Sequence, residues 1–148
     1  MNDNTQSSPS ESQQDPSVVL SFIGIAHTIE ARLEATLAGL GLSLAKVGVL
    51  KNLAEAGTPL TLGELAERNS CVRSNITQLI DRLEADQLVR RVKDPHDRRS
   101  IRAALTPAGQ QACTEAVQLL TAAEQTIVGT LTPANREALQ EALAHFTS

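Results

Sequence analysis

Length, composition and charge limit the class of protein. The 148 residues are 41% apolar but include neither Trp nor Tyr, which predicts one domain whose helices pack through aliphatic side chains. No apolar stretch approaches the about 20 residues that span a bilayer, no secretory signal is visible, and we expect no membrane partner. The formal net charge of -4, taken alone, argues against a nucleic-acid partner.

The N-terminal part divides into a tail and a helix. Residues 1–16 are rich in Ser, Gln, Asn and Asp and almost free of apolar side chains, so we expect a disordered tail. From Ser17 onward, apolar residues recur at steps of three and four, which predicts a helix with one buried face. Gly39 and Gly41 are expected to end it.

Two further helices are predicted by their start and stop signals. Ser43 can cap a second helix, which Gly57 and the following proline end. Thr61 and Glu64 form a capping box that opens a short third helix over residues 62–68.

The next segment predicts a helix-turn-helix and a hairpin. A tight turn at residues 69–70 leads into a fourth helix that starts near Cys71 to Arg73 and has one apolar face. Residues 88–93 and 101–105 are short stretches with Val and Ile, separated by a turn-forming segment. We expect a two-stranded hairpin, or wing, between these stretches.

Two more helices complete the chain. Thr106 with Pro107 at the first helical position opens a long fifth helix. Thr132 with Pro133 repeats this signal for a last helix, which we expect to reach Phe146.

Basic residues are concentrated in the middle of the chain. Residues 60–105 carry nine of the thirteen Lys and Arg against seven acidic residues, a net charge of +2. Residues 1–59 and 106–148 each have a net charge of -3. The negative charge therefore belongs to the terminal regions, and we infer an assembly part at the two ends and a nucleic-acid-binding part in the centre.

The start of the fourth helix has the polar side chains that a DNA-recognition helix needs. A helix in the major groove presents its first turns to base edges and phosphates. The polar residues at these positions are Arg73, Ser74, Asn75, Thr77 and Gln78. Arginine pairs with guanine or phosphate, and Asn or Gln pairs with adenine. The alternative is an ordinary solvated helix face, but the hairpin that follows favours DNA.

Arginines crowd the tip of the hairpin, residues 94–102. Arg98, Arg99 and Arg102 repel one another there, and an anion such as the DNA minor groove would relieve that repulsion. Asp97 lies two residues before Arg99 and is expected to hold its guanidinium extended. The alternative is an arginine-rich turn that only keeps the protein soluble.

At this point the sequence resembles the MarR family of bacterial and archaeal transcriptional regulators. The resemblance runs over residues 62–110, and its specific part is DPHDRR followed by a strand and LTPAG. It implies a mainly helical, winged helix-turn-helix homodimer with a small two-stranded wing. Residues 17–42 and 106–148 would form the dimerisation region, and residues 43–105 would bind successive major grooves of a pseudo-palindromic operator.

The resemblance also assigns roles by position. It places Arg99 in the minor groove, with Asp97 as its orienting carboxylate, and Ser74, Thr77 and Gln78 at DNA-contacting positions of the recognition helix.

Two positions depart from the family pattern. Gln87 stands where the family usually has Gly, so it must adopt or avoid a left-handed conformation that costs roughly 1 kcal/mol. Val72 replaces the usual Ser at the start of the recognition helix, which makes Ser70 the candidate cap.

The resemblance leaves two kinds of switch open, a small aromatic or phenolic ligand and thiol oxidation. Cys71 lies at a helix N-terminus near Arg68 and Arg73, a setting that favours a reactive thiol; the alternative is a small apolar side chain in the core. His27 interrupts an apolar helix and is a candidate ligand contact, unless it is satisfied within the dimer interface.

Other function classes lack their signatures. The sequence has no GxGxxG or Walker pattern, and His27, His96 and His145 lack metal-ligand spacing, so we expect no enzyme, cofactor or metal. Cys71 and Cys113 lie far apart without a CxxC spacing, which fits a reducing cytoplasm. The predicted function is a sequence-specific DNA-binding repressor. The alternative is a winged-helix module that binds an acidic protein.

Overall fold

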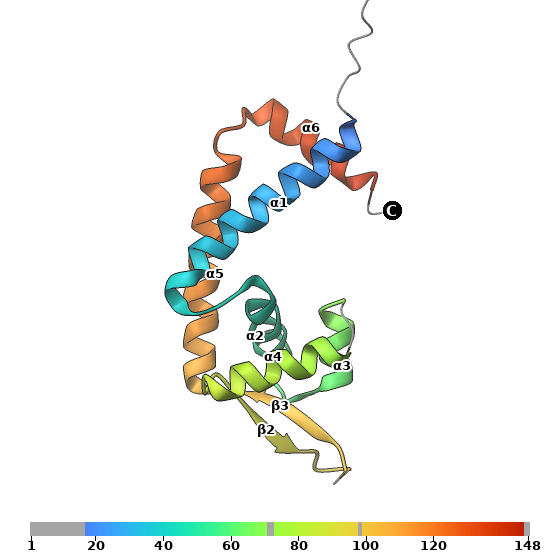
Figure 1. Ribbon diagram of the computed structural model, residues 1–148, viewed down its shortest axis with the longest axis vertical. Helices are drawn as coiled ribbons and strands as arrows, with labels where there is room; N and C mark the ends of the chain where they lie inside the picture. The colour runs from blue at the N-terminus through green and yellow to red at the C-terminus, as the bar shows by residue number, and fades with distance from the viewer. Residues whose placement is uncertain (1–16, 71–72, 98, 147–148) are drawn as a thin grey trace, which may run out of the picture. The chain divides into compact units, whose positions relative to one another are not determined.

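The structure is a computed structural model that describes residues 17–70, 73–97 and 99–146, and it is mainly helical with one small antiparallel sheet (Figure 1). Its elements in chain order are α1 (Val18–Leu37), a 3-10 turn (Ala38–Leu40), α2 (Leu44–Ala56), β1 (Leu60–Thr61), α3 (Leu62–Arg68), α4 (Arg73–Ala85), β2 (Val89–Lys93), β3 (Ile101–Leu105), α5 (Pro107–Val128) and α6 (Pro133–Ala144). The predicted fold class, a winged helix-turn-helix with long terminal helices, is confirmed. The predicted tail, residues 1–16, lies outside the described residues.

Internal contacts divide the chain into two compact units, and the boundary in the sequence lies between Ala31 and Arg32. In the first unit, α1 exposes a series of large apolar side chains: Val18, Val19, Leu20, Ile23 and Ile25. Within the described residues, no single helix is long and apolar enough to cross a membrane. One bent pair, Val18–Leu40 with Leu44–Ala56, meets the criteria of length and composition when taken together.

Side-chain caps start four helices at the predicted positions. Each cap accepts a hydrogen bond from the backbone N–H three residues later, which satisfies a donor that has no partner inside the helix. The caps are Ser43, Thr61, Thr106 and Thr132. The capping box of Thr61 and Glu64 is complete, because the Glu64 carboxylate accepts the Thr61 backbone N–H at 2.7 Å.

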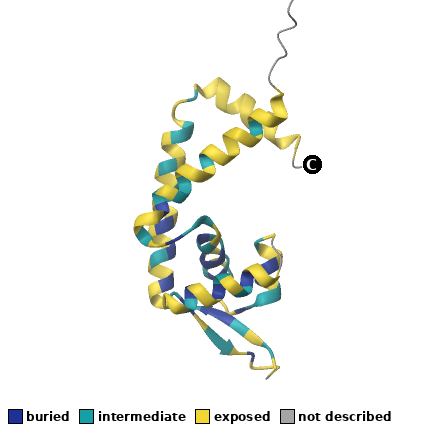
Figure 2. Ribbon diagram, viewed as in Figure 1, coloured by how far each residue is buried: buried dark blue, intermediate teal, exposed yellow. Residues whose placement is uncertain are grey.

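The core lies in the second unit, between α2, α3, α4, the sheet and the first half of α5 (Figure 2). As predicted, it is aliphatic. Its largest fully buried side chains are Leu37, Leu50, Leu65, Ile76, Ile80, Leu83, Val49 and Val89. Burying each contributes about 1.5–3 kcal/mol, and because they come from α1, α2, α3, α4 and β2 they hold α4 against the sheet.

The sheet has three strands in the order β1-β3-β2, whereas the sequence predicted two. β2 and β3 form the expected hairpin, with Arg91 opposite Ala103. The additional strand β1 pairs Leu60 with Ala103 on the other edge of β3. It was missed because two residues are too short to show an alternating pattern.

The turn from α4 into β2 contains the expected backbone departure. Gln87 has φ 60°, the left-handed conformation that Gly normally supplies, at a cost of roughly 1 kcal/mol. The Gln87 N–H donates to the Glu84 carbonyl, and the Leu88 N–H donates to the Leu83 carbonyl, which is a complete Schellman motif.

The first turn of α4 differs from the expectation for its cap. Ser70 has φ 50°, which is not the extended conformation of an N-cap residue. Cys71 and Val72 lie outside the described residues.

The last helix is shorter than predicted. α6 ends at Ala144, and His145 and Phe146 form a turn, because the His145 N–H donates to the Ala142 carbonyl three residues earlier.

A groove of about 610 Å³ lies between the second half of α5 and α6. Its apolar wall includes Val128, Leu139 and Leu143.

Candidate nucleic-acid interface

The described part of α4 buries one face and presents the predicted DNA-binding residues on the others. Ile76, Ile80 and Leu83 are fully buried. The exposed polar residues are Arg73, Ser74, Asn75, Gln78, Asp81 and Arg82, and Thr77 is half-buried. The Thr77 hydroxyl donates to the Arg73 carbonyl at 3.1 Å, so its oxygen can still accept a hydrogen bond.

Helical spacing divides the exposed side of α4 into a centre and two flanks. With about 3.6 residues per turn, Ser74 and Gln78 lie opposite the buried face. Asn75 and Arg82 lie on the flank that faces α2, and Glu84 lies on the flank that contacts β2. Ser74 and Gln78 are therefore placed best for base edges.

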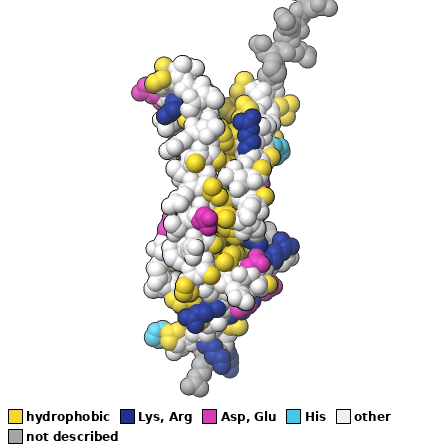
Figure 3. Space-filling model, turned by 90° about the vertical axis from the view of Figure 1, so that its left-hand side faces the viewer, with side chains coloured by type: hydrophobic (Ala, Val, Ile, Leu, Met, Phe, Trp, Pro, Cys, Tyr) yellow, Lys and Arg dark blue, Asp and Glu magenta, His cyan; other side chains and the backbone are white. Residues whose placement is uncertain are grey.

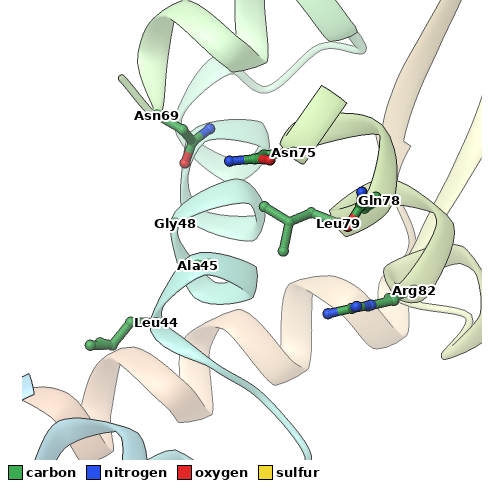
Figure 4. Close-up of a pocket in the computed structure, with 8 residues that line it drawn as sticks. All are labelled: Leu44, Ala45, Gly48, Asn69, Asn75, Gln78, Leu79 and Arg82. Carbon is green, nitrogen blue, oxygen red and sulfur yellow. The ribbon is translucent and has the colours of Figure 1, made fainter. Parts of the chain in front are cut away.

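A groove of about 440 Å³ separates α4 from the first half of α2 (Figure 4). Asn75, Gln78 and Arg82 line its α4 side, and Leu44, Ala45 and Gly48 line its α2 side. Gly48 has no side chain, and a Cβ added at this position would lie 2.9 Å from the Asn69 Oδ1 atom. Amide and guanidinium donors beside an open groove are suited to bases and phosphates. Arg82 was not among the predicted site residues, although it lies one turn after Gln78.

The wing tip is a turn that Asp97 closes. The Asp97 carboxylate accepts the Arg99 backbone N–H at 3.0 Å, and the Ser100 N–H donates to the Asp97 carbonyl at 2.9 Å. Asp97 was expected to hold the Arg99 guanidinium, but its carboxylate binds the backbone of that residue instead. Arg99 is exposed, and Arg98 lies outside the described residues.

The sequence suggested that Arg102 belongs to a cluster of unpaired arginines at the wing tip, but the structure shows that it is paired. Its Nε donates to the buried Asp94 carboxylate at 2.5 Å, and its Nη1 donates to the Pro59 carbonyl at 3.2 Å and lies 3.5 Å from the Glu64 carboxylate. The pKa of Asp94 is held below its ordinary value, first by the His96 backbone N–H and then by the Arg102 side chain. Arg102 therefore ties the wing to Pro59, the residue before β1, and to α3.

Ion pairs sort the basic residues of the centre into two groups. Arg91 and Arg102 are paired with carboxylates of the same chain. Within the described residues, no ion pair involves Arg68, Arg73, Arg82, Arg90, Lys93 or Arg99. Lys and Arg side chains are visible at the wing end of this unit (Figure 3). The second group provides cationic side chains that are available to an anionic partner.

The candidate switch residues occupy different environments. Cys71 lies outside the described residues, and His27 is exposed on α1. Cys113 is buried in the core, where burial raises the pKa of its thiol, the opposite of what a reactive cysteine needs. Among the described residues, no group of three or more His, Cys, Asp or Glu could hold a metal ion.

Comparison with known proteins agrees with this architecture. The MarR family model matches residues 40–100. Two Bacillus subtilis proteins named as uncharacterized HTH-type transcriptional regulators match short segments. YsmB is 43% identical over 58 residues, 39% of this chain and 40% of YsmB, and YcgE is 47% identical over 49 residues, 33% of this chain and 31% of YcgE. The matches thus span less than half of either relative.

Solved structures match over most of the chain. BpsR from Bordetella bronchiseptica is 25% identical with a TM-score of 0.77, covering 95% of this chain and 99% of BpsR. MarR from E. coli in its apo form is 22% identical with a TM-score of 0.75, covering 91% of this chain and 100% of MarR. In its fold and in the sequence of residues 40–100, the chain is similar to MarR-family regulators.

Proposed function

We propose that the chain is a sequence-specific DNA-binding transcriptional regulator, a repressor that binds a pseudo-palindromic operator as a homodimer. The observation that carries the proposal is the exposed side of α4. Ser74 and Gln78 lie opposite the buried Ile76 and Ile80, as a helix in the major groove requires. Arg99 is exposed at the wing tip, and its guanidinium has no ion pair among the described residues, so it would enter the adjacent minor groove.

Exposed apolar surface supports the homodimer. Large apolar side chains are exposed on α5 and α6, where Leu119, Leu139 and Leu143 are 38%, 39% and 46% exposed. Two of these side chains, Leu139 and Leu143, also line the groove between the two helices. A second copy of the chain would remove this surface from water, and its two-fold axis would place two recognition helices about one DNA turn apart.

We also infer release from DNA by an effector. In the structurally similar BpsR, 6-hydroxynicotinic acid regulates DNA binding. The corresponding proposal here is a small aromatic or phenolic acid, with His27 as one of its contacts. Oxidation of Cys71 is the second candidate signal.

Selection of DNA by the purified protein tests this function. We expect fragments enriched from a random-sequence pool to share an inverted repeat with half-sites one helical turn apart. Adding 6-hydroxynicotinic acid or peroxide to the selected duplex is expected to release the protein in one of the two arms. If peroxide releases wild type and Cys71→Ser equally, Cys71 is not the sensor. Enrichment of unrelated sequences would instead favour a winged helix that binds protein.

A further inference from the structure

One basic residue of the central region is held between the two DNA-binding elements of the fold. Arg91 lies in β2, and its guanidinium donates through Nη2 to the Asp81 carboxylate and through Nη1 to the Glu84 carboxylate. Both acids belong to α4. The Arg91 side chain is only 26% exposed, so this arginine is much less accessible to DNA than the wing-tip arginine.

Glu84 binds both the side chain and the backbone of Arg91. Its Oε1 atom accepts the Arg91 backbone N–H at 3.0 Å. In the hairpin, the Leu88 carbonyl accepts the Thr106 N–H, and the Asp94 N–H donates to the Ser100 carbonyl. Hydrogen-bonded and non-hydrogen-bonded pairs alternate in an antiparallel ladder, so the pair of Arg91 and Ala103 is not hydrogen-bonded. The Arg91 N–H therefore points away from β3. Glu84 therefore caps the free edge of β2, and its pKa is held below its ordinary value, first by this backbone hydrogen bond.

The contact gives α4 and β2 a second point of attachment. The first is the turn at Gln87, where the Schellman motif joins the end of the helix to the start of the strand. Val89 packs in the core with α4, and Arg102 links β3 to Pro59 and Glu64. The attachment at Arg91 adds a restraint on the direction of the hairpin from α4 itself. The direction of the hairpin decides where Arg99 lies when α4 occupies the major groove.

We propose that Arg91 is a positioning residue for DNA binding, which holds the wing at a fixed angle to the recognition helix through Asp81 and Glu84. This inference rests on the proposed DNA-binding function. In this proposal, Arg91 has a different role from the neighbouring Arg90. Arg90 is exposed, has no ion pair among the described residues and remains available for a phosphate.

The test uses the full chain and a duplex that the wild type has selected from a random-sequence pool. If no sequence is selected, the proposed function fails and Arg91 is not at issue. With a selected duplex, Asp81→Ala combined with Glu84→Ala is expected to lower affinity about tenfold, because the wing is no longer held. Electrostatics alone predicts the opposite, since the change removes two negative charges beside the DNA and frees Arg91. Affinity that rises or stays equal would overturn the proposal.

The matched control is Glu67→Ala, which removes an exposed acid from α3 that has no ion pair among the described residues. We expect this variant to bind the selected duplex at least as tightly as the wild type. Circular dichroism melting and size-exclusion chromatography show which variants keep the fold and the dimer.

A double-mutant cycle separates positioning from a purely structural role. Arg99→Ala is expected to lower affinity about 100-fold in the wild-type dimer but less than about tenfold in an Arg91→Met background, because a displaced wing no longer places Arg99 in the groove. An equal loss in both backgrounds would show that Arg91 does not position the wing. If Arg91→Met fails to fold, the cycle is run in the Asp81→Ala, Glu84→Ala background instead.

Discussion

Replacing Arg99 by alanine is expected to weaken binding to the selected duplex about 100-fold. Arg99 is exposed at the wing tip, where Asp97 binds its backbone N–H and leaves the guanidinium to a partner. Loss of one minor-groove arginine costs about 1–3 kcal/mol. A cost of about 1.4 kcal/mol is tenfold in affinity, and a dimer loses two such contacts. The slope of log affinity against log salt should become less steep by about 2, because two fewer cations displace counterions.

The control is Arg99→Lys, which keeps the positive charge. We expect it to keep the salt slope of the wild type and to lose less affinity, because lysine fits a narrow groove less well but still neutralises it. A gel-shift or anisotropy titration at several salt concentrations measures both quantities. If Arg99→Ala binds the selected duplex as tightly as the wild type, the assignment of this arginine to the minor groove is wrong.

Replacing Gly109 by alanine is expected to destabilise the fold by about 2–3 kcal/mol. Gly109 is buried in the first turn of α5, and a Cβ there would lie 1.9 Å from the Leu88 carbonyl oxygen and 2.9 Å from the Leu105 side chain. The Leu88 carbonyl cannot move easily, because it accepts both the backbone N–H and the hydroxyl of Thr106. The start of α5 must therefore shift away from the turn between α4 and β2.

Chemical denaturation measured by circular dichroism checks this prediction. The matched control is Gly63→Ala in α3, where the nearest atom to an added Cβ is the Thr61 Oγ1 at an ordinary 3.8 Å. Because alanine restricts the unfolded chain and favours a helix, that variant should be equal to the wild type or more stable by up to about 1 kcal/mol. Equal stability of Gly109→Ala and the wild type would mean that α5 does not approach Leu88 this closely.

Local signals made much of the fold predictable from the sequence. A cap such as Ser43 or Thr106 acts on a backbone N–H only three residues away, so the helix starts were found from short motifs. The resemblance left open whether Gln87 adopts or avoids a left-handed conformation, and the structure shows that it adopts one. Strand β1 was missed, because its pairing joins Leu60 to Ala103 across a long separation in sequence.

The site was predicted less completely, since charge alone does not reveal ion-pair partners. The exposed polar face of α4 was found, because amphipathic spacing separates it from Ile76 and Ile80. Arg102 looked like a free wing arginine, but the fold brings it to Asp94 and Glu64. Only tertiary structure shows which arginines are already paired with carboxylates and which are not.

The most direct test of DNA recognition is the affinity of the wild-type protein for its selected duplex, measured between low and physiological salt with excess competitor DNA. We predict a steep linear fall of log affinity with log salt, from several phosphate contacts, and a complex that survives the competitor. A salt-independent affinity, or equal binding to selected and random duplexes, would contradict a role in sequence-specific regulation.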